Sequence, residues 1–107
     1  MAEVKYSQDA KNDLEQIGDY IAKELKNPTA ALNTVSRIQN AIGKLGYAPR
    51  IGVPLSARYE NAGDYRFLVC GNYLAFYHEE GQIVYIDRIL YGRRDYMKIL
   101  FGDLPEE

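Results

Sequence analysis

Apolar residues in the first half of the chain recur at the spacing of a helix. Leu14, Ile17, Ile21 and Leu25 follow one another at intervals of three and four residues, so a helix places them on one face. Ser7 stands where the N-cap of this helix belongs. A second stripe of the same kind predicts a second helix, and it consists of Ala31, Leu32, Val35, Ile38, Ile42 and Leu45.

The boundary between these two helices is short. Asn27 is a good N-cap, Pro28 suits the first helical position, and Gly46 is typical of a helix end. Helices joined by so few residues pack against each other as an antiparallel hairpin.

The pattern of the second half is that of β-strands. A short alternating strand, Glu3–Tyr6, precedes the helices, and three further strands follow them: Tyr65–Cys70, Tyr73–His78 and Gln82–Tyr91. Gly71-Asn72 predicts a two-residue hairpin turn, and Glu79–Gly81 predicts the next turn. The last strand is the most apolar, which favours an interior position in the sheet.

The segment 47–63 contains Pro49, Pro54, Gly52 and Gly63 without a clear period, and it is expected to be a long connection. After the last strand, residues 97–101 are expected to form a short helical or irregular tail. All 107 residues fit one domain, because one hydrophobic core accounts for this length. The order of elements predicts an α+β fold in which the helical hairpin covers one face of a mainly antiparallel sheet.

The predicted turn sets the phase of the strands. If Gly71-Asn72 is the whole loop, Cys70 pairs with Tyr73. One face then holds Tyr65, Phe67, Val69, Leu74, Phe76 and His78. This face is the more apolar, so we expect it under the helices. The open face would hold Arg66, Leu68, Cys70, Tyr73, Ala75 and Tyr77. The face of Arg88 stays open, because a two-residue and a three-residue turn place it on opposite sides.

The composition and net charge limit which partners and ligands the chain is expected to have. Thirteen basic and fifteen acidic residues give a net charge of −2, which does not fit a protein that coats nucleic acid. The single cysteine and the lack of an apolar leader or membrane span predict a cytoplasmic protein with no membrane partner. One His and one Cys exclude a zinc site built on those ligands, and Cys70 with His78 is the only possible cysteine–histidine pair. No metal or other cofactor is expected.

Four segments resemble the RelE/ParE toxin superfamily: Asp13–Ile21, Tyr65–Val69, Gly71–Tyr77 and Val84–Asp95. Their order covers almost the whole chain. The resemblance implies a RelE/ParE-like fold and a role as the toxin of a type II toxin–antitoxin module. It also implies a cognate antitoxin as partner, contact with operator DNA only through the antitoxin complex, and growth inhibition until the antitoxin neutralises the toxin.

Within the superfamily, RelE-like members cleave messenger RNA on the ribosome without a metal, and ParE-like members bind DNA gyrase. RelE-type cleavage needs a base, an acid and cations around the phosphate. If this chain were RelE-like, the resemblance would assign catalysis to Arg66, Arg94 and Tyr96. Two positions that are basic in RelE are Leu68 and Leu74 here, and Arg88–Asp95 is closer to the ParE pattern. The sequence therefore favours the ParE-like branch, with an mRNA endoribonuclease as the first alternative and a non-toxic, antitoxin-binding member as the second.

Six residues are candidates for binding the target: Arg66, Tyr73, Tyr77, Arg88, Arg93 and Arg94. Arginine suits phosphate or carboxylate, and exposed tyrosine suits stacking on a base or contact with a protein. Arg88 has a structural alternative, because an arginine inside an apolar strand requires a partner, and Asp64 or Glu60 could supply one. His78 is expected under the helices, and Cys70 is expected to be inert filling.

Overall fold

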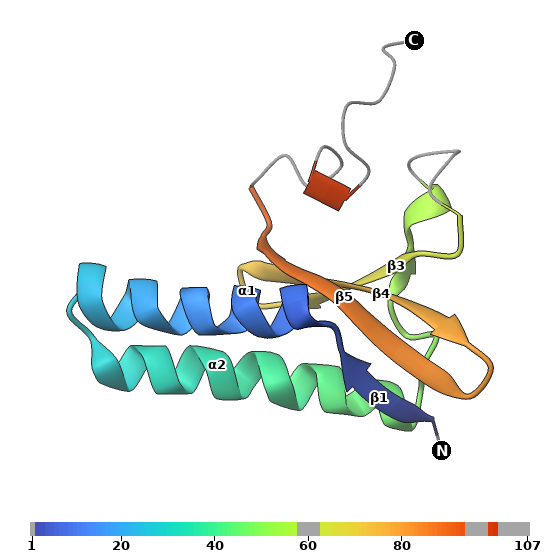
Figure 1. Cartoon of the computed structure of the whole chain (residues 1–107), viewed down its shortest axis with the longest axis horizontal. Coiled ribbons are helices and arrows are strands. Elements are labelled where there is room, and N and C mark those ends of the chain that lie inside the picture. Colours follow the sequence, from blue (N-terminus) through green and yellow to red (C-terminus); the bar gives the residue numbers. More distant parts are fainter. Residues whose placement is uncertain (1, 58–62, 94–98, 101–107) are drawn as a thin grey trace, which may run out of the picture.

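The computed structural model describes residues 2–57, 63–93 and 99–100 of the chain. Within them, two antiparallel helices lie side by side against a five-stranded sheet (Figure 1). The helical part consists of α1 (Gln8–Asp19), a π-helical turn (Tyr20–Glu24), α2 (Pro28–Gly43) and a 3₁₀ turn (Lys44–Gly46). The predicted N-caps are confirmed, because the side chains of Ser7 and Asn27 accept hydrogen bonds from the backbone N–H groups of Ala10 and Ala30.

The sheet has the strand order β1-β5-β4-β3-β2. Its strands are β1 (Glu3–Tyr6), β2 (Val53–Pro54), β3 (Arg66–Cys70), β4 (Tyr73–Glu80) and β5 (Ile83–Tyr91). The β1–β5 pair is parallel and the other pairs are antiparallel. The predicted fold class, the pairing of Cys70 with Tyr73 and the interior position of the last strand are all confirmed.

The turn between β4 and β5 lies one residue later than predicted. Glu80 pairs with Ile83, so the loop is Gly81-Gln82, and Gly81 has a φ of 64°. Further along, the register shifts between Phe76 and Tyr77, where β5 contains one extra residue. Such a β-bulge bends the strand and re-aims the side chains beside it.

The prediction of which sheet face lies under the helices is wrong. Cys70, Ala75 and Tyr77, expected on the open face, are buried in one core with Ile38 and Ile42 of α2. The small side chains Cys70 and Ala75 leave room for the close approach of a helix.

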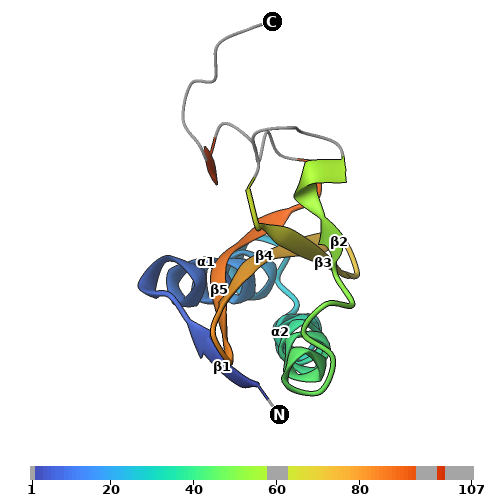
Figure 2. The same cartoon turned by 90° about the vertical axis from the view of Figure 1, so that its right-hand side faces the viewer.

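The other face of the sheet, expected under the helices, carries a second core. Phe67, Phe76, Leu90 and Leu55 are buried there, with Ile99 and Leu100 packed against them. The segment 99–100 of the predicted tail lies on the side of the sheet away from the helices (Figures 1 and 2). Both faces are therefore covered over part of their area.

The side chain of Tyr77 holds the long connection in place through two hydrogen bonds. Its hydroxyl donates to the carbonyl of Pro49 at 2.8 Å and accepts from the N–H of Gly52 at 3.0 Å. A Cβ at position 52 would lie 2.4 Å from this hydroxyl oxygen, so only glycine fits. Tyr77 is thus a buried residue that holds the loop, its predicted position on an open face is wrong, and its role in binding the target stays a prediction.

Two leucines of the predicted helical stripes lie outside the core. Leu25 is 57 % exposed and Leu32 is 72 % exposed, so the stripes are narrower than the spacing indicated. Within the residues described, no helix has the length and hydropathy needed to cross a bilayer.

Candidate functional site

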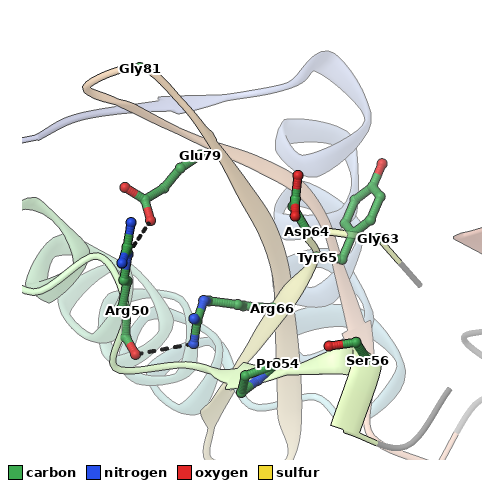
Figure 3. A pocket seen from close by; sticks show the side chains of 9 residues that line it. All are labelled: Arg50, Pro54, Ser56, Gly63, Asp64, Tyr65, Arg66, Glu79 and Gly81. Atoms are coloured by element: carbon green, nitrogen blue, oxygen red, sulfur yellow. Dashed lines mark hydrogen bonds and ion pairs between the residues drawn. The ribbon is translucent and has the colours of Figure 1, made fainter. Parts of the chain in front are cut away.

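Two arginines line a depression of about 440 Å³ beside the end of β3. We call it the arginine pocket, and its lining is Arg50, Pro54, Ser56, Gly63, Asp64, Tyr65, Arg66, Glu79 and Gly81. Figure 3 shows Arg50, Arg66 and Glu79 turned toward one another on one side, with Asp64, Tyr65 and Ser56 on the other. The pocket therefore joins the connection before β3 to the β4–β5 hairpin.

Arg66 is held by the backbone of the long connection. Its Nη1 donates to the carbonyl of Gly52 at 2.9 Å and to the carbonyl of Arg50 at 3.3 Å. Because Tyr77 holds the same loop from the opposite side, the guanidinium of Arg66 has a fixed orientation. The structure thus places Arg66, one of the six sequence candidates, in a pocket, where it is half-buried and donates to two backbone carbonyls.

Acidic groups balance the arginines in this region. The side chain of Arg50 is 79 % exposed, and its Nε lies 3.4 Å from a carboxylate oxygen of Glu79. Asp64 lies on the opposite wall. An RNA phosphate would meet carboxylates as well as cations here, which weakens its binding.

Next to the pocket, His78 lies in a cluster that the sequence analysis did not anticipate. Its Nδ1 is 2.5 Å from Asp87 and its Nε2 is 3.3 Å from Glu80. The ring stacks on Tyr85 at 5.4 Å and lies 5.6 Å from Tyr65. His78 is half-buried and has no place in either core, so its predicted position under the helices is wrong.

These neighbours change the protonation of His78. Burial lowers its pKa, but the hydrogen bond and the charge of Asp87, together with those of Glu80, outweigh it, so the pKa is raised from 6.5. Burial also raises the pKa of Asp87, against the opposing effect of His78. The ring is thus biased toward the imidazolium form.

The Asp87 member of this cluster lies at the β5 bulge. Asp87 is the residue of β5 without a partner on β4, and its carbonyl accepts a hydrogen bond from the Ser7 hydroxyl at 2.8 Å. The signal that could have found the Asp87–His78 contact is the diagonal position of Asp87 relative to the His78–Tyr85 pair.

Arg88 is engaged in a partly buried ion pair. Its Nε and Nη2 donate to the two carboxylate oxygens of Asp13 in α1 at 2.7 and 2.8 Å, and one of these oxygens also accepts from the N–H of Ile89 at 2.9 Å. The predicted need for a partner is confirmed, but the partner is Asp13 and not Asp64. The other predicted partner, Glu60, lies outside the described residues. Arg88 thus has its strongest donors occupied and is poorly placed to bind a target.

A second surface, which we call the apolar groove, has a volume of about 920 Å³ and lies between the tip of the helical hairpin and the β3–β4 turn. Its exposed apolar side chains include Tyr20, Leu25 and Tyr91. Tyr73 also lines it, with its ring edge-on to Tyr91 at 5.7 Å. Large exposed apolar surface of this kind marks protein contact sites, so the candidate role of Tyr73 is retained as a prediction.

The remaining candidates are accounted for as follows. Arg93 is exposed directly after Gly92, whose N–H donates to the carbonyl of Asn72 at 2.9 Å. Arg94 and Tyr96 lie outside the described residues. Burial raises the pKa of Cys70 to about 11, so its thiol stays protonated at neutral pH, as expected of inert filling. Among the described residues, no group of three or more His, Cys, Asp or Glu is arranged to hold a metal ion.

The helical hairpin on a mainly antiparallel sheet, with β1 parallel to β5, agrees with the RelE/ParE-like fold that the sequence resemblance implies. Residues 4–96 match the family model described as "ParE toxin of type II toxin-antitoxin system, parDE". Because the match spans most of the chain, the protein belongs to the ParE toxin family.

One solved structure has the same fold. A chain from the "Chromosomal ParDE TA system from P. aeruginosa" superposes with a TM-score of 0.72 at 24 % identity, covering 85 % of this chain and 96 % of that one. YafQ from E. coli strain BL21(DE3) matches with a TM-score of 0.47 at 16 % identity, covering 95 % of this chain and 100 % of that one. No curated protein sequence matches the chain.

Proposed function

We propose that this ParE-type toxin inhibits growth by binding DNA gyrase in the cytoplasm, without catalysing RNA cleavage, and that a cognate antitoxin neutralises it. The charge of the sheet surface around Arg66 is the observation that supports binding over cleavage. Metal-independent cleavage of RNA needs several cations free to hold the negative charge that develops on the phosphate.

Among the residues that the structure describes, such free cations are scarce around Arg66. Arg50 contacts Glu79, His78 lies between Asp87 and Glu80, and Arg88 is paired with Asp13. The two RelE positions that would add positive charge are leucines, and Leu68 packs against the helix-side core while Leu74 packs against the second core. A surface of mixed charge suits recognition of a protein better than stabilisation of a phosphorane.

The apolar groove is the proposed antitoxin site. Tyr20, Leu25 and Tyr91 expose apolar surface there, beside the helical hairpin and the end of β5. An amphipathic helix or an extended segment would bury these side chains. Leu25→Glu is expected to weaken antitoxin binding at least tenfold without unfolding the toxin, because Leu25 is 57 % exposed.

The target can be tested by pulse labelling in cells that express this chain without its antitoxin, with DNA and protein synthesis followed separately. If the proposal is correct, DNA synthesis stops first, and the purified full chain inhibits supercoiling by purified gyrase. Early arrest of protein synthesis, with cleaved mRNA ending in a 2′,3′-cyclic phosphate, would instead establish the RelE-like alternative. Soluble protein with no effect on either process would contradict the role in growth inhibition.

A further inference from the structure

The arginine pocket has one wall that is organised without any ligand. Arg66 donates to the carbonyls of Arg50 and Gly52 from one side of the loop, and Tyr77 holds Pro49 and Gly52 from the other. A guanidinium fixed in this way loses little conformational freedom when it binds a partner.

The free edge of Arg66 is suited to a carboxylate. Both of its hydrogen bonds within the described part of the chain use Nη1, which leaves the N–H groups of Nε and Nη2 for another acceptor. This edge of arginine matches the two oxygens of a carboxylate. Arg66 lines the pocket together with Arg50, so two guanidinium groups can meet at one anion.

Glu79 indicates which anion the pocket accepts. It is a carboxylate of the chain itself, and it reaches Arg50 through one contact of 3.4 Å at an arginine that is 79 % exposed. Such a surface pair is weak and can be displaced. A phosphate dianion would meet stronger repulsion from Glu79 and Asp64 than a singly charged carboxylate does.

We propose that the arginine pocket is the subsite for an aspartate or glutamate side chain of the protein target. The incoming carboxylate takes the place of Glu79 at Arg50 and is bound by the Nε–Nη2 edge of Arg66. This assignment rests on the proposed function, because it names the chemical group of the target that the toxin recognises.

The test uses the full chain and purified gyrase, with the dissociation constant measured for four variants. Arg50→Ala should weaken binding about tenfold or more, the loss that accompanies one charge-assisted hydrogen bond. Glu79→Gln should strengthen binding several-fold, because it removes the internal competitor and keeps the side-chain shape. The double variant Arg50→Glu with Glu79→Arg can keep an ion pair between positions 50 and 79. It has no arginine at position 50, so it should bind gyrase as weakly as Arg50→Ala does. Lys11→Ala, an exposed charge removed from α1, is the matched control and should bind like the unsubstituted chain.

A second measurement separates this proposal from the choice of target. Acetate is titrated into the isotope-labelled chain while the side-chain Nε–H signals of Arg50 and Arg66 are followed by NMR, with acetamide as the neutral control. Both signals should move with acetate and neither with acetamide. If they do so although the chain fails to bind gyrase, gyrase is the wrong target and the pocket chemistry stands.

Two results would overturn the subsite. One is gyrase binding in which Arg50→Ala and Glu79→Gln behave like Lys11→Ala, which leaves the proposed function intact. The other is a stronger response of the two arginine signals to inorganic phosphate than to acetate at equal concentration, which would point to a phosphate ligand.

Discussion

Asp13 joins α1 to the sheet, and its removal is the most informative stability test in this fold. The carboxylate is 8 % exposed and accepts three hydrogen bonds, two from Arg88 and one from the N–H of Ile89. We consider Asp13→Ala, which leaves a largely buried guanidinium and a buried backbone N–H without their acceptor.

The size of the effect follows from this arrangement. Removing one partner of a buried ion pair costs about 3–5 kcal/mol, because the remaining charge stays desolvated. At about 4 °C per kcal/mol for a domain of this size, the melting temperature should fall by roughly 12–20 °C. Asp13→Asn keeps the shape and one acceptor oxygen, so it should cost less, about 1–3 kcal/mol.

The assay is urea unfolding at pH 7 followed by far-ultraviolet circular dichroism, since the chain has no tryptophan. The control is Asp13→Leu combined with Arg88→Met, which replaces the ion pair by apolar side chains. It should lose less stability than Asp13→Ala, because both charges are removed together. A loss of about 1–3 kcal/mol should remain, because the buried N–H of Ile89 still lacks its acceptor.

A cost below about 1 kcal/mol for Asp13→Ala would refute the reasoning, since it would mean that water solvates Arg88 once Asp13 is gone. An equally large loss in the double variant would also contradict it. In that case the loss of stability would come from changing the side chains at positions 13 and 88, and not from an unpaired charge.

Three further predictions concern the pocket region. Tyr77→Phe keeps the ring but leaves the buried N–H of Gly52 and a loop carbonyl unpaired, so thermal unfolding should show a loss of about 1–3 kcal/mol. Gly52→Ala should cost a similar amount or more through overpacking, because the added Cβ would lie under 3 Å from the Tyr77 hydroxyl, the Tyr77 ring and the carbonyl oxygen of Phe67. The loss should persist in Gly52→Ala with Tyr77→Phe, since that change removes only the contact with the hydroxyl, and full recovery in the double variant would contradict this. The raised pKa values of His78 and Asp87 both mean that the folded state holds protons more tightly than the unfolded state. The stabilisation from His78 is therefore complete below about pH 6.5 and is lost as the pH rises through the folded-state pKa of His78. His78→Gln removes this contribution, so the unfolding free energy should depend less steeply on pH above about 6.5. An unchanged slope would contradict this.

Local sequence signals predicted the elements of this fold well. The caps Ser7 and Asn27, the two-residue turn at Gly71-Asn72 and the strand register that follows from it depend only on neighbours in the chain. The same signals placed Arg66 on the open face of the sheet, whereas the face that it shares with Cys70 and Ala75 lies under the helices and Arg66 contacts the long connection at its edge. They did not reveal Arg50, because its place beside Arg66 depends on how a long connection without periodicity folds back.

The prediction of which sheet face the helices cover was wrong for a physical reason. The number of apolar residues favoured the face with Phe67 and Phe76 as the one under the helices, on the assumption that only one face would be buried. The connection and residues 99–100 bury that face instead, and the helices take the face where Cys70 and Ala75 allow close packing. Side-chain size, and not hydrophobicity alone, decided the arrangement.

The two misplaced aromatic residues show why this choice matters for function. Because the face of Tyr77 lies under the helices, its hydroxyl is available to hold the loop that carries Arg50 and Gly52, and through that loop to orient Arg66. His78, one residue later, consequently points away from the helix-side core, where it meets Asp87 at the bulge. A surface of mixed charge therefore follows from the packing of β4. Tyr77, which was expected to touch the target, supports the arginine pocket from inside, and His78 contributes to the surface beside that pocket.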